Sequence, residues 1–141
     1  MSGRLVVIGG GAAGMSAASA ARRTDPSLEV VVLESGPYPS YGVCGIPYFL
    51  GGVVEHGEDL IAHPFEEFTG RRRIDLRLGV SVEAVDVVER TVQMAGGPDL
   101  GYDTLVLASG ASPIRPPVPG VDLEGVVAIR RLDEAITLRQ R

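Results

Sequence analysis

The sequence predicts an α/β fold in which parallel strands alternate with helices. Residues 5–8 and 29–33 are short, continuous apolar runs, the pattern of strands that are buried on both faces of a sheet. Between them, residues 12–23 are rich in alanine and methionine and predict a helix, which the approach to Pro26 ends. Strand, helix and strand within about thirty residues form a βαβ unit, which brings the two strands together in parallel.

The segment after this unit predicts a loop, a helix and another strand. Residues 35–52 have the composition of a loop, with an apolar stretch at 46–50. Residues 64–73 predict a helix, because proline is favoured in a first helical turn. Residues 74–78 then predict a strand.

The last third of the chain predicts an antiparallel insertion and a final strand. Residues 80–94 alternate valine with polar side chains, which indicates antiparallel strands with a turn near Glu89 and Arg90. Residues 104–108 return to the buried-strand pattern. Four prolines within residues 111–120 predict an extended connection. A helical pattern at 132–141 has no carboxyl-terminal cap, from which we expect the chain to be part of a longer protein.

Composition excludes several classes of function. The chain has 141 residues, 45% hydrophobic and 22% charged, as a single globular domain does. Its formal net charge of −5 argues against nucleic-acid binding. Arg71, Arg72 and Arg73 form the one tight basic cluster, and such a run is usually a solvated helix face.

The single cysteine and the lack of a targeting signal predict a cytoplasmic protein without a membrane anchor. Cys44 alone excludes an internal disulfide framework and fits a reducing compartment. The apolar stretch 5–21 is too short and too rich in glycine for a membrane span, and only Arg4 precedes it as a basic residue. One cysteine and two histidines, His56 and His63, predict no metal site; both histidines are expected in surface loops.

A glycine fingerprint predicts a dinucleotide site. Gly9, Gly11 and Gly14 follow the first strand and open the helix, and Glu34 stands twenty positions later at the end of the second strand. Gly9 permits the tight turn, Gly11 lets the backbone approach a pyrophosphate, and Gly14 lets helix and strand pack closely. The helix amino terminus favours phosphate. Glu34 can accept hydrogen bonds from ribose hydroxyls and would repel a 2′-phosphate, so NADP is disfavoured here. The fingerprint alone does not separate FAD from NAD.

Cys44 stands where a redox cysteine is expected. It lies in a polar loop directly before an apolar segment that could be helical, where a thiolate would be stabilised. The alternative is a small, inert hydrophobic side chain. Together with the glycine fingerprint and Glu34, the stretch from Ser40 to Tyr48 resembles the single-cysteine class of pyridine nucleotide–disulfide oxidoreductases, and the resemblance covers essentially the whole chain.

This class contains coenzyme A disulfide reductases, coenzyme A-dependent persulfide reductases, NADH oxidases and NADH peroxidases. The resemblance implies a glutathione reductase-like, Rossmann-type FAD-binding domain with a parallel sheet and an antiparallel β insertion. Residues 1–120 would be its first part, and residues 121–141 the connection to an NAD(P)H-binding domain that this chain lacks. It also implies a homodimer as the full-length form.

The resemblance implies particular cofactor contacts as well. Ala108-Ser109-Gly110 is similar to a flavin-contact motif that usually reads Ala-Thr-Gly, and Arg130 resembles a flavin-contacting arginine. The expected FAD-binding residues are Gly9, Gly11, Ala12, Ala13, Gly14, Glu34, Ser35, Val82, Ala108, Ser109, Gly110 and Arg130.

Within the class, the sequence favours the coenzyme A enzymes. Oxidases and peroxidases carry a histidine in the glycine loop, where this chain has Ala12 and Ala13. The residues that the resemblance assigns to coenzyme A are Ser16, Arg23, Ser40 and Arg72. The chain departs from the family in having Val43 where asparagine is frequent, and Arg72 where lysine is common. Arg22 and Arg23 could equally be a solvated helix end.

The implied reaction passes a hydride from NAD(P)H to FAD, and then electrons to a mixed disulfide between Cys44 and coenzyme A, so that a disulfide or persulfide is reduced. Tyr41 and Tyr48 are expected to pack near the flavin or coenzyme A. Two other hypotheses remain at this point: a non-catalytic FAD-binding module, and an electron-transfer reductase in which Cys44 is incidental. An NADH oxidase is the alternative within the class.

Overall fold

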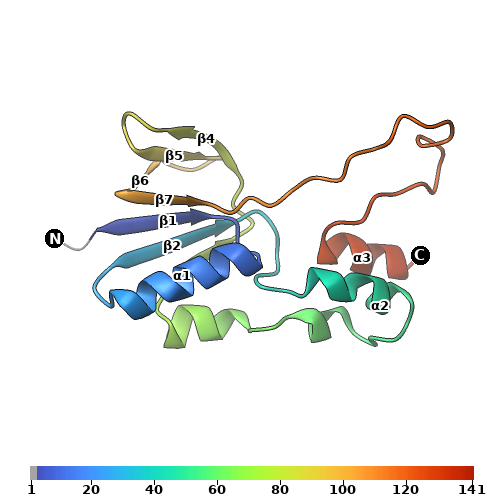
Figure 1. The fold of residues 1–141 in the computed structure, drawn as a ribbon, viewed down its shortest axis with the longest axis horizontal. Coiled ribbons are helices and arrows are strands. Elements are labelled where there is room, and N and C mark those ends of the chain that lie inside the picture. Colours follow the sequence, from blue (N-terminus) through green and yellow to red (C-terminus); the bar gives the residue numbers. More distant parts are fainter. Residues whose placement is uncertain (1–2) are drawn as a thin grey trace.

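The computed structural model describes residues 3–141 and is built around a four-stranded parallel sheet (Figure 1). Its strands are β1 (Arg4–Ile8), β2 (Glu29–Glu34), β3 (Asp75–Leu78) and β7 (Thr104–Leu107). They lie in the order β3-β2-β1-β7, and each neighbouring pair is parallel. Helix α1 (Ala12–Thr24) joins β1 to β2 and completes the predicted βαβ unit. The predicted α/β fold is therefore confirmed.

The central strands are buried on both faces, each face against a different layer. Val7 of β1 packs with Met15 of α1 on one face. Val6, the neighbouring residue, packs with Val92 of a second sheet on the other face. Since successive side chains of a strand point to opposite faces, a continuous apolar run is what two cores require.

The second sheet is the predicted antiparallel insertion. It consists of β4 (Val82–Asp86), β5 (Thr91–Met94) and β6 (Leu100–Gly101), in that order. The turn between β4 and β5 contains Arg90 in the left-handed region, with φ of 52°. The predicted turn is thus confirmed, whereas the two-residue strand β6 is an addition that its sequence did not signal.

The helix predicted at 64–73 is wrong in length and in type. Phe65 and Glu66 are α-helical, and a π-helical turn, η3 (Glu67–Arg71), follows them. Thr69 and Gly70 are poor helix formers, and the Ile74 N–H turns back to donate to the Phe68 carbonyl at 3.0 Å. Arg73 lies outside the helix with φ of 49°. The following strand begins at Asp75, one residue later than predicted.

Strand β7 exists as predicted, but the expectation that it is buried is wrong. Leu107 is 69% exposed, and Thr104 is exposed as well. Within the described residues β7 has one hydrogen-bonded neighbour, β1, and therefore forms an edge of the sheet. Its apolar composition does not reveal how many neighbours it has.

The carboxyl-terminal segment leaves the sheet and returns to the cysteine region. Residues 108–131 contain no helix or strand and extend away from both sheets, as the prolines predicted (Figure 1). Helix α3 (Leu132–Arg139) then packs on α2 (Ile46–Leu50) through a cluster containing Ile46, Phe49 and Ala135. Two short 3₁₀ turns, η1 (Val43–Gly45) and η2 (Gly57–Leu60), flank α2. No helix among the described residues is long and apolar enough to cross a membrane.

Candidate functional site

The glycine turn between β1 and α1 has the geometry that its sequence predicts. Gly9 has φ of 107°, and a Cβ on it would lie 2.1 Å from the Ala108 carbonyl oxygen. A Cβ on Gly14 would lie 1.8 Å from the Gly9 carbonyl oxygen. A Cβ on Gly11 would have nothing within 4 Å, because this position faces open space. Two of the glycines therefore serve backbone packing, and the third leaves room for a ligand.

Glu34 is held across this turn by main-chain donors. One carboxylate oxygen accepts from the Gly10 N–H at 2.6 Å, and the other accepts from the Gly36 N–H at 2.6 Å. The Ser35 hydroxyl donates to the latter oxygen, Oε1, as well, at 3.4 Å. A carboxylate offers about four acceptor positions, so one remains for a hydroxyl group of a ligand. A Cβ on Gly10 would lie 2.8 Å from the Glu34 Cβ, so Gly10 belongs to the site although the fingerprint does not specify it.

A cleft of about 690 Å³ lies at the carboxyl ends of β1, β2 and β7. This is where parallel sheets bind ligands, at the point where the chain crosses from one side of β1 to the other. All of the predicted cofactor residues except Gly14 line it. These are Gly9, Gly11, Ala12, Ala13, Glu34, Ser35, Val82, Ala108, Ser109, Gly110 and Arg130. Gly14 is buried one turn behind them, at the contact of α1 with β1.

The residues of this cleft fit an adenine dinucleotide. Gly11 is the N-cap of α1 and provides no side-chain hydrogen bond, so first-turn N–H groups of the helix have no side-chain partner. The first turn also carries no acidic residue that would repel a phosphate. Unpaired donors at one end and the Glu34 carboxylate beside them suit a pyrophosphate and a ribose, respectively.

The wall opposite the glycine turn contains two arginines, of which the sequence pointed to one. Arg130 donates from Nε to the Ala111 carbonyl at 3.2 Å. Arg131, which was not predicted, donates to both carboxylate oxygens of Asp133, at 3.0 and 3.1 Å. This hydrogen-bonded pair raises the pKa of Arg131, so the guanidinium stays charged at the edge of the cleft. The one feature of the sequence that could have pointed to Arg131 is its position next to Arg130.

Cys44 is exposed and lies in the turn η1 beside this cleft. Val43, the preceding residue, lines the cleft. Ser40 fixes the loop to the glycine turn, because its N–H donates to the Gly10 carbonyl at 2.8 Å. Ser40 has φ of 47°, a strained conformation for a residue other than glycine. The loop thereby places a free thiol close to the dinucleotide cleft.

The two tyrosines near Cys44 differ in their surroundings. Tyr41 is half-buried and lines the cleft. Burial raises its pKa, so its phenol is neutral at physiological pH. Tyr48 is 60% exposed. Their predicted packing near flavin or coenzyme A stays a prediction.

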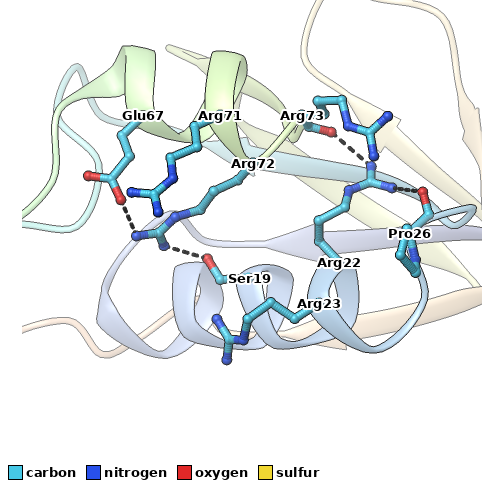
Figure 2. A pocket seen from close by; sticks show the side chains of 8 residues that line it. All are labelled: Ser19, Arg22, Arg23, Pro26, Glu67, Arg71, Arg72 and Arg73. Atoms are coloured by element: carbon cyan, nitrogen blue, oxygen red, sulfur yellow. Dashed lines mark hydrogen bonds and ion pairs between the residues drawn. The ribbon is translucent and has the colours of Figure 1, made fainter.

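A second cavity, of about 430 Å³, lies between the end of α1 and η3 (Figure 2). Its lining residues are Ser19, Arg22, Arg23, Pro26, Glu67, Arg71, Arg72 and Arg73. Of the residues assigned to coenzyme A, Arg23 and Arg72 meet here, 49 positions apart in the sequence. Ser16 is exposed on α1, and Ser40 lies in the cysteine loop, so the structure does not bring these two into the cavity.

The interpretation of the 71–73 run as solvated helix surface is wrong for Arg72, and the solvated helix end that was one of two possibilities for Arg22 is not observed. Arg72 is half-buried and donates to Ser19 Oγ at 2.8 Å and to Glu67. Arg22 donates to the carbonyls of Pro26, Leu28 and Arg73. Periodicity did not reveal these contacts, because their partners lie on other elements or on the main chain after the helix.

The two histidines also differ. His56 is exposed, as predicted. His63 is half-buried, with Nδ1 2.9 Å from a Glu67 carboxylate oxygen and its ring edge-on to Phe68. His63 nevertheless lies in a loop with its side chain 45% exposed, as predicted, and its contact with Glu67 is the part that the sequence did not signal. Residues 3–141 contain no cluster of three metal-ligating side chains.

Comparison with known proteins agrees with this geometry. Residues 3–141 match the family described as pyridine nucleotide-disulphide oxidoreductase. The chain is 42% identical over 137 residues to the "NAD(P)H sulfur oxidoreductase (CoA-dependent)" of Pyrococcus abyssi, covering 96% of this chain and 30% of that protein. It is 40% identical over 141 residues to the "NAD(P)H coenzyme A polysulfide/persulfide reductase" of Pyrococcus horikoshii, covering 99% and 32%.

Solved structures give the same result. An NAD-dependent persulfide reductase from A. fulgidus matches with a TM-score of 0.88 and 36% identity, covering 97% of this chain and 27% of that one. The reduced CoADR-RHD of Bacillus anthracis matches with a TM-score of 0.92 and 29% identity, covering 99% and 26%. The chain thus spans about 30% of the length of the curated relatives it matches. It belongs to the pyridine nucleotide–disulphide oxidoreductase family.

Proposed function

We propose that this chain is the FAD-binding first part of an NAD(P)H oxidoreductase that reduces coenzyme A disulfide or persulfide through Cys44. One observation carries the proposal. The loop that contains the exposed Cys44 is held against the glycine turn of the cleft by a hydrogen bond of 2.8 Å from the Ser40 N–H to the Gly10 carbonyl. The family uses FAD and NAD(P)H, and relatives named as coenzyme A-dependent support the coenzyme. Residues 1–120 would form the FAD domain, with residues 121–141 as the connection that follows.

In this proposal the cleft residues hold FAD by complementary chemistry. The α1 N–H groups above Gly11 would bind the pyrophosphate, and the Glu34 carboxylate would accept from a ribose hydroxyl. Ala12 and Ala13 keep the first turn free of bulk, while Ser35 and Val82 line the far side. Residues 108–110 and Arg130 would border the flavin end. When bound, FAD supplies the two-electron chemistry that links NAD(P)H to a disulfide at Cys44.

Cys44 would act as the nucleophile. Its thiolate attacks one sulfur of the disulfide, a new S–S bond to Cys44 forms, and the original S–S bond breaks. The departing thiolate takes up a proton. Reduction of the resulting mixed disulfide by two electrons, which bound FAD would supply, and uptake of one proton would release the second thiol and restore the Cys44 thiolate. Residues 1–141 hold no second thiol that could pair with Cys44, and coenzyme A would serve as an external partner.

The arginine cavity would hold the charged end of this substrate. Arg23 and Arg72 suit phosphate groups, because a guanidinium is a fixed fork of donors. Ser16 and Ser40 would lie along the coenzyme nearer the cysteine. The single cysteine supports a cytoplasmic location. We also propose a homodimer as the full-length form.

An NADH oxidase is the second candidate. A Methanocaldococcus jannaschii protein named "NADH oxidase" is 34% identical over 135 residues, covering 93% of this chain and 30% of that protein. The exposed thiol could also form a sulfenic acid during oxygen reduction. Ala12 and Ala13 disfavour an NADH oxidase. They stand in the glycine loop where the oxidases of this class carry a histidine that supports a sulfenic acid.

The state of Cys44 in the full-length protein separates these candidates. The protein is purified oxidised, and its intact mass is measured before and after a reductant is added. A coenzyme A adduct that is lost on reduction, and is absent from Cys44→Ser, supports the coenzyme A enzyme. A free thiol or a sulfenic acid instead favours the oxidase. Purification without flavin would favour neither and would indicate a non-catalytic module.

A further inference from the structure

One carboxylate lies among the arginines of the second cavity. Glu67 is the single acidic residue in its lining, beside five arginines. A carboxylate weakens the binding of a nearby anion by repulsion. Glu67 at a proposed phosphate site must therefore have a role other than ligand contact. The assignment of Arg23 and Arg72 to the coenzyme does not explain that role.

Glu67 and Ser19 hold the Arg72 guanidinium from two sides, as Figure 2 shows. Nη1 donates to Ser19 Oγ at 2.8 Å, and Nη2 donates to Glu67 Oε1. The guanidinium carbon lies 4.8 Å from the ring centroid of Phe68. A guanidinium has five N–H donors, so three remain after these two bonds. The Arg72 side chain is 25% exposed, which keeps it accessible to a ligand.

Ser19 is notable for its burial. Across residues 3–141 it is the one buried polar or charged side chain, with 4% exposure. A buried hydroxyl is costly unless it has a hydrogen-bond partner. That partner is Arg72, 53 positions away on another element. The Ser19 hydroxyl thus provides a fixed anchor on α1 for a cation that comes from the end of η3.

Arg22 fixes the main chain that carries Arg72. Its guanidinium donates to the Arg73 carbonyl at 2.8 Å and to the Pro26 carbonyl at 3.0 Å, and it also donates to the Leu28 carbonyl. These bonds tie the end of α1 to the turn in which Arg73 has φ of 49°. The donors of Arg22 are directed at the backbone, whereas those of Arg72 are partly free.

We propose that Glu67 and Ser19 are positioning residues, which set the Arg72 guanidinium between α1 and η3 before the substrate arrives, so that it and Arg23 receive a coenzyme A phosphate together. This inference rests on the proposed function. An arginine that is already held loses less rotamer entropy on binding than a free one. Hydrogen bonds from Arg72, and then from His63, hold the pKa of Glu67 below its usual range, which keeps the anchor charged.

Calorimetric binding of coenzyme A to the full-length protein tests this proposal. A Cys44→Ser parent prevents formation of a mixed disulfide. Glu67→Ala and Ser19→Ala are each expected to raise the Kd about tenfold, the size of a lost charge-assisted hydrogen bond. Glu66→Ala is the matched control, because Glu66 is exposed and lies outside the cavity lining. It removes the same charge and is expected to change the Kd by less than about twofold.

A positioning role makes two further requirements. In an Arg72→Ala background, Glu67→Ala and Ser19→Ala should cause no further weakening, because they act through Arg72. Glu67→Gln keeps an acceptor oxygen for Arg72, and should restore the Kd to within about threefold of the parent. With Cys44 present, the variants should raise KM for coenzyme A disulfide and leave the rate of flavin reduction by NAD(P)H unchanged.

Several outcomes would overturn the proposal. Tighter binding by Glu67→Ala would show that Glu67 only repels the ligand. Equal effects of Glu67→Ala and Glu66→Ala, or additive weakening in the Arg72→Ala background, would show that Arg72 is not the intermediary. If the Cys44→Ser parent itself binds no coenzyme A, the coenzyme assignment falls together with the positioning role. If the parent binds and the variants match the control, only the positioning role falls.

Discussion

At the scale of single residues, the glycine turn separates backbone requirements from ligand requirements. A Cβ on Gly14 would meet the Gly9 carbonyl oxygen at 1.8 Å, whereas a Cβ on Gly11 would meet nothing within 4 Å. The first contact is between parts of the protein itself. The second position matters only when a dinucleotide occupies the space in front of it.

Gly14→Ala and Gly11→Ala should therefore fail in different ways. In full-length protein, we expect Gly14→Ala to prevent folding or to lower stability severely, because helix and turn cannot separate without losing their packing. Gly11→Ala should fold and lose most of its FAD. Thermal melting and the ratio of flavin to protein absorbance measure both effects. Gly70→Ala, which places its Cβ in open space far from the cleft, serves as the control. Equal melting temperatures for Gly14→Ala and Gly11→Ala would contradict the distinction.

Glu34 has a structural role in addition to its proposed contact with ribose. Both of its oxygens accept main-chain N–H groups, those of Gly10 and Gly36. Glu34→Gln would oppose one of these donors with an amide NH2 group, which leaves a donor unpaired at a cost of about 1–3 kcal/mol. We expect lower stability to denaturant together with reduced FAD content. Ser35→Ala removes only the 3.4 Å hydrogen bond from Ser35 Oγ to Glu34 Oε1 and should change stability much less. A Glu34→Gln protein of unchanged stability would show that these hydrogen bonds contribute little.

At the scale of secondary-structure elements, sequence patterns predicted the features that depend on residues close together in the chain. The βαβ unit was evident because Val6 and Val7 are apolar side by side, as two buried faces demand. The end of η3 was not evident, since it depends on Phe68 packing in the core and on Arg22 holding the Arg73 carbonyl. The exposure of Leu107 depends on how many strands lie next to β7 in the sheet, and a short stretch of sequence does not reveal that number.

The same limit applies to the candidate site. Of the cleft residues, Gly9, Gly11 and Glu34 were predicted from the spacing of the fingerprint, whereas the others followed from the resemblance to a known family. The Ser19–Arg72–Glu67 contact joins elements 53 residues apart, and neither Ser19 nor Glu67 belongs to a motif. Their relation follows only from the packing of α1 against η3. Sequence reasoning therefore pointed to Arg23 and Arg72 but not to Ser19 and Glu67, which contact Arg72.

The link between α1 and η3 should depend on pH. The folded-state pKa of Glu67 is lowered, chiefly by the hydrogen bond from Arg72 and secondly by that from His63. A lowered pKa means that the contribution to stability is present above the ordinary glutamate pKa, and is lost as pH falls through the folded-state value. We expect the melting-temperature difference between the full-length protein and Glu67→Gln to be constant near neutrality and to shrink in acid. The same comparison with Glu66→Gln should show no such trend, and parallel profiles for both variants would refute the link.

At the scale of the whole molecule, β7 and the extended segment after it carry exposed apolar side chains. Leu107 on β7 is 69% exposed, and Ile114 and Leu123 in the extended segment are 92% and 67% exposed. The chain spans about 30% of the length of its curated relatives. Exposed apolar patches of this kind mark surfaces that other parts of a protein cover. Because β7 is an edge strand and the exposed residues Ser109 and Gly110 that follow it line the cleft, we expect a dinucleotide bound there to be partly open to solvent.

We consequently expect residues 1–141, produced alone, to retain FAD weakly or not at all and to oxidise no NAD(P)H. Affinity falls when a ligand is left partly uncovered, because less of its surface is removed from water. The flavin-to-protein absorbance ratio after gel filtration, compared with that of the full-length protein, measures retention. Circular dichroism shows whether the short chain has folded, so that loss of flavin is not mistaken for loss of structure. Added FAD should produce weak, saturable quenching of flavin fluorescence if the cleft is formed but incomplete. Stoichiometric FAD together with NADH turnover by the 141-residue polypeptide would show that the cleft of residues 3–141 is sufficient by itself.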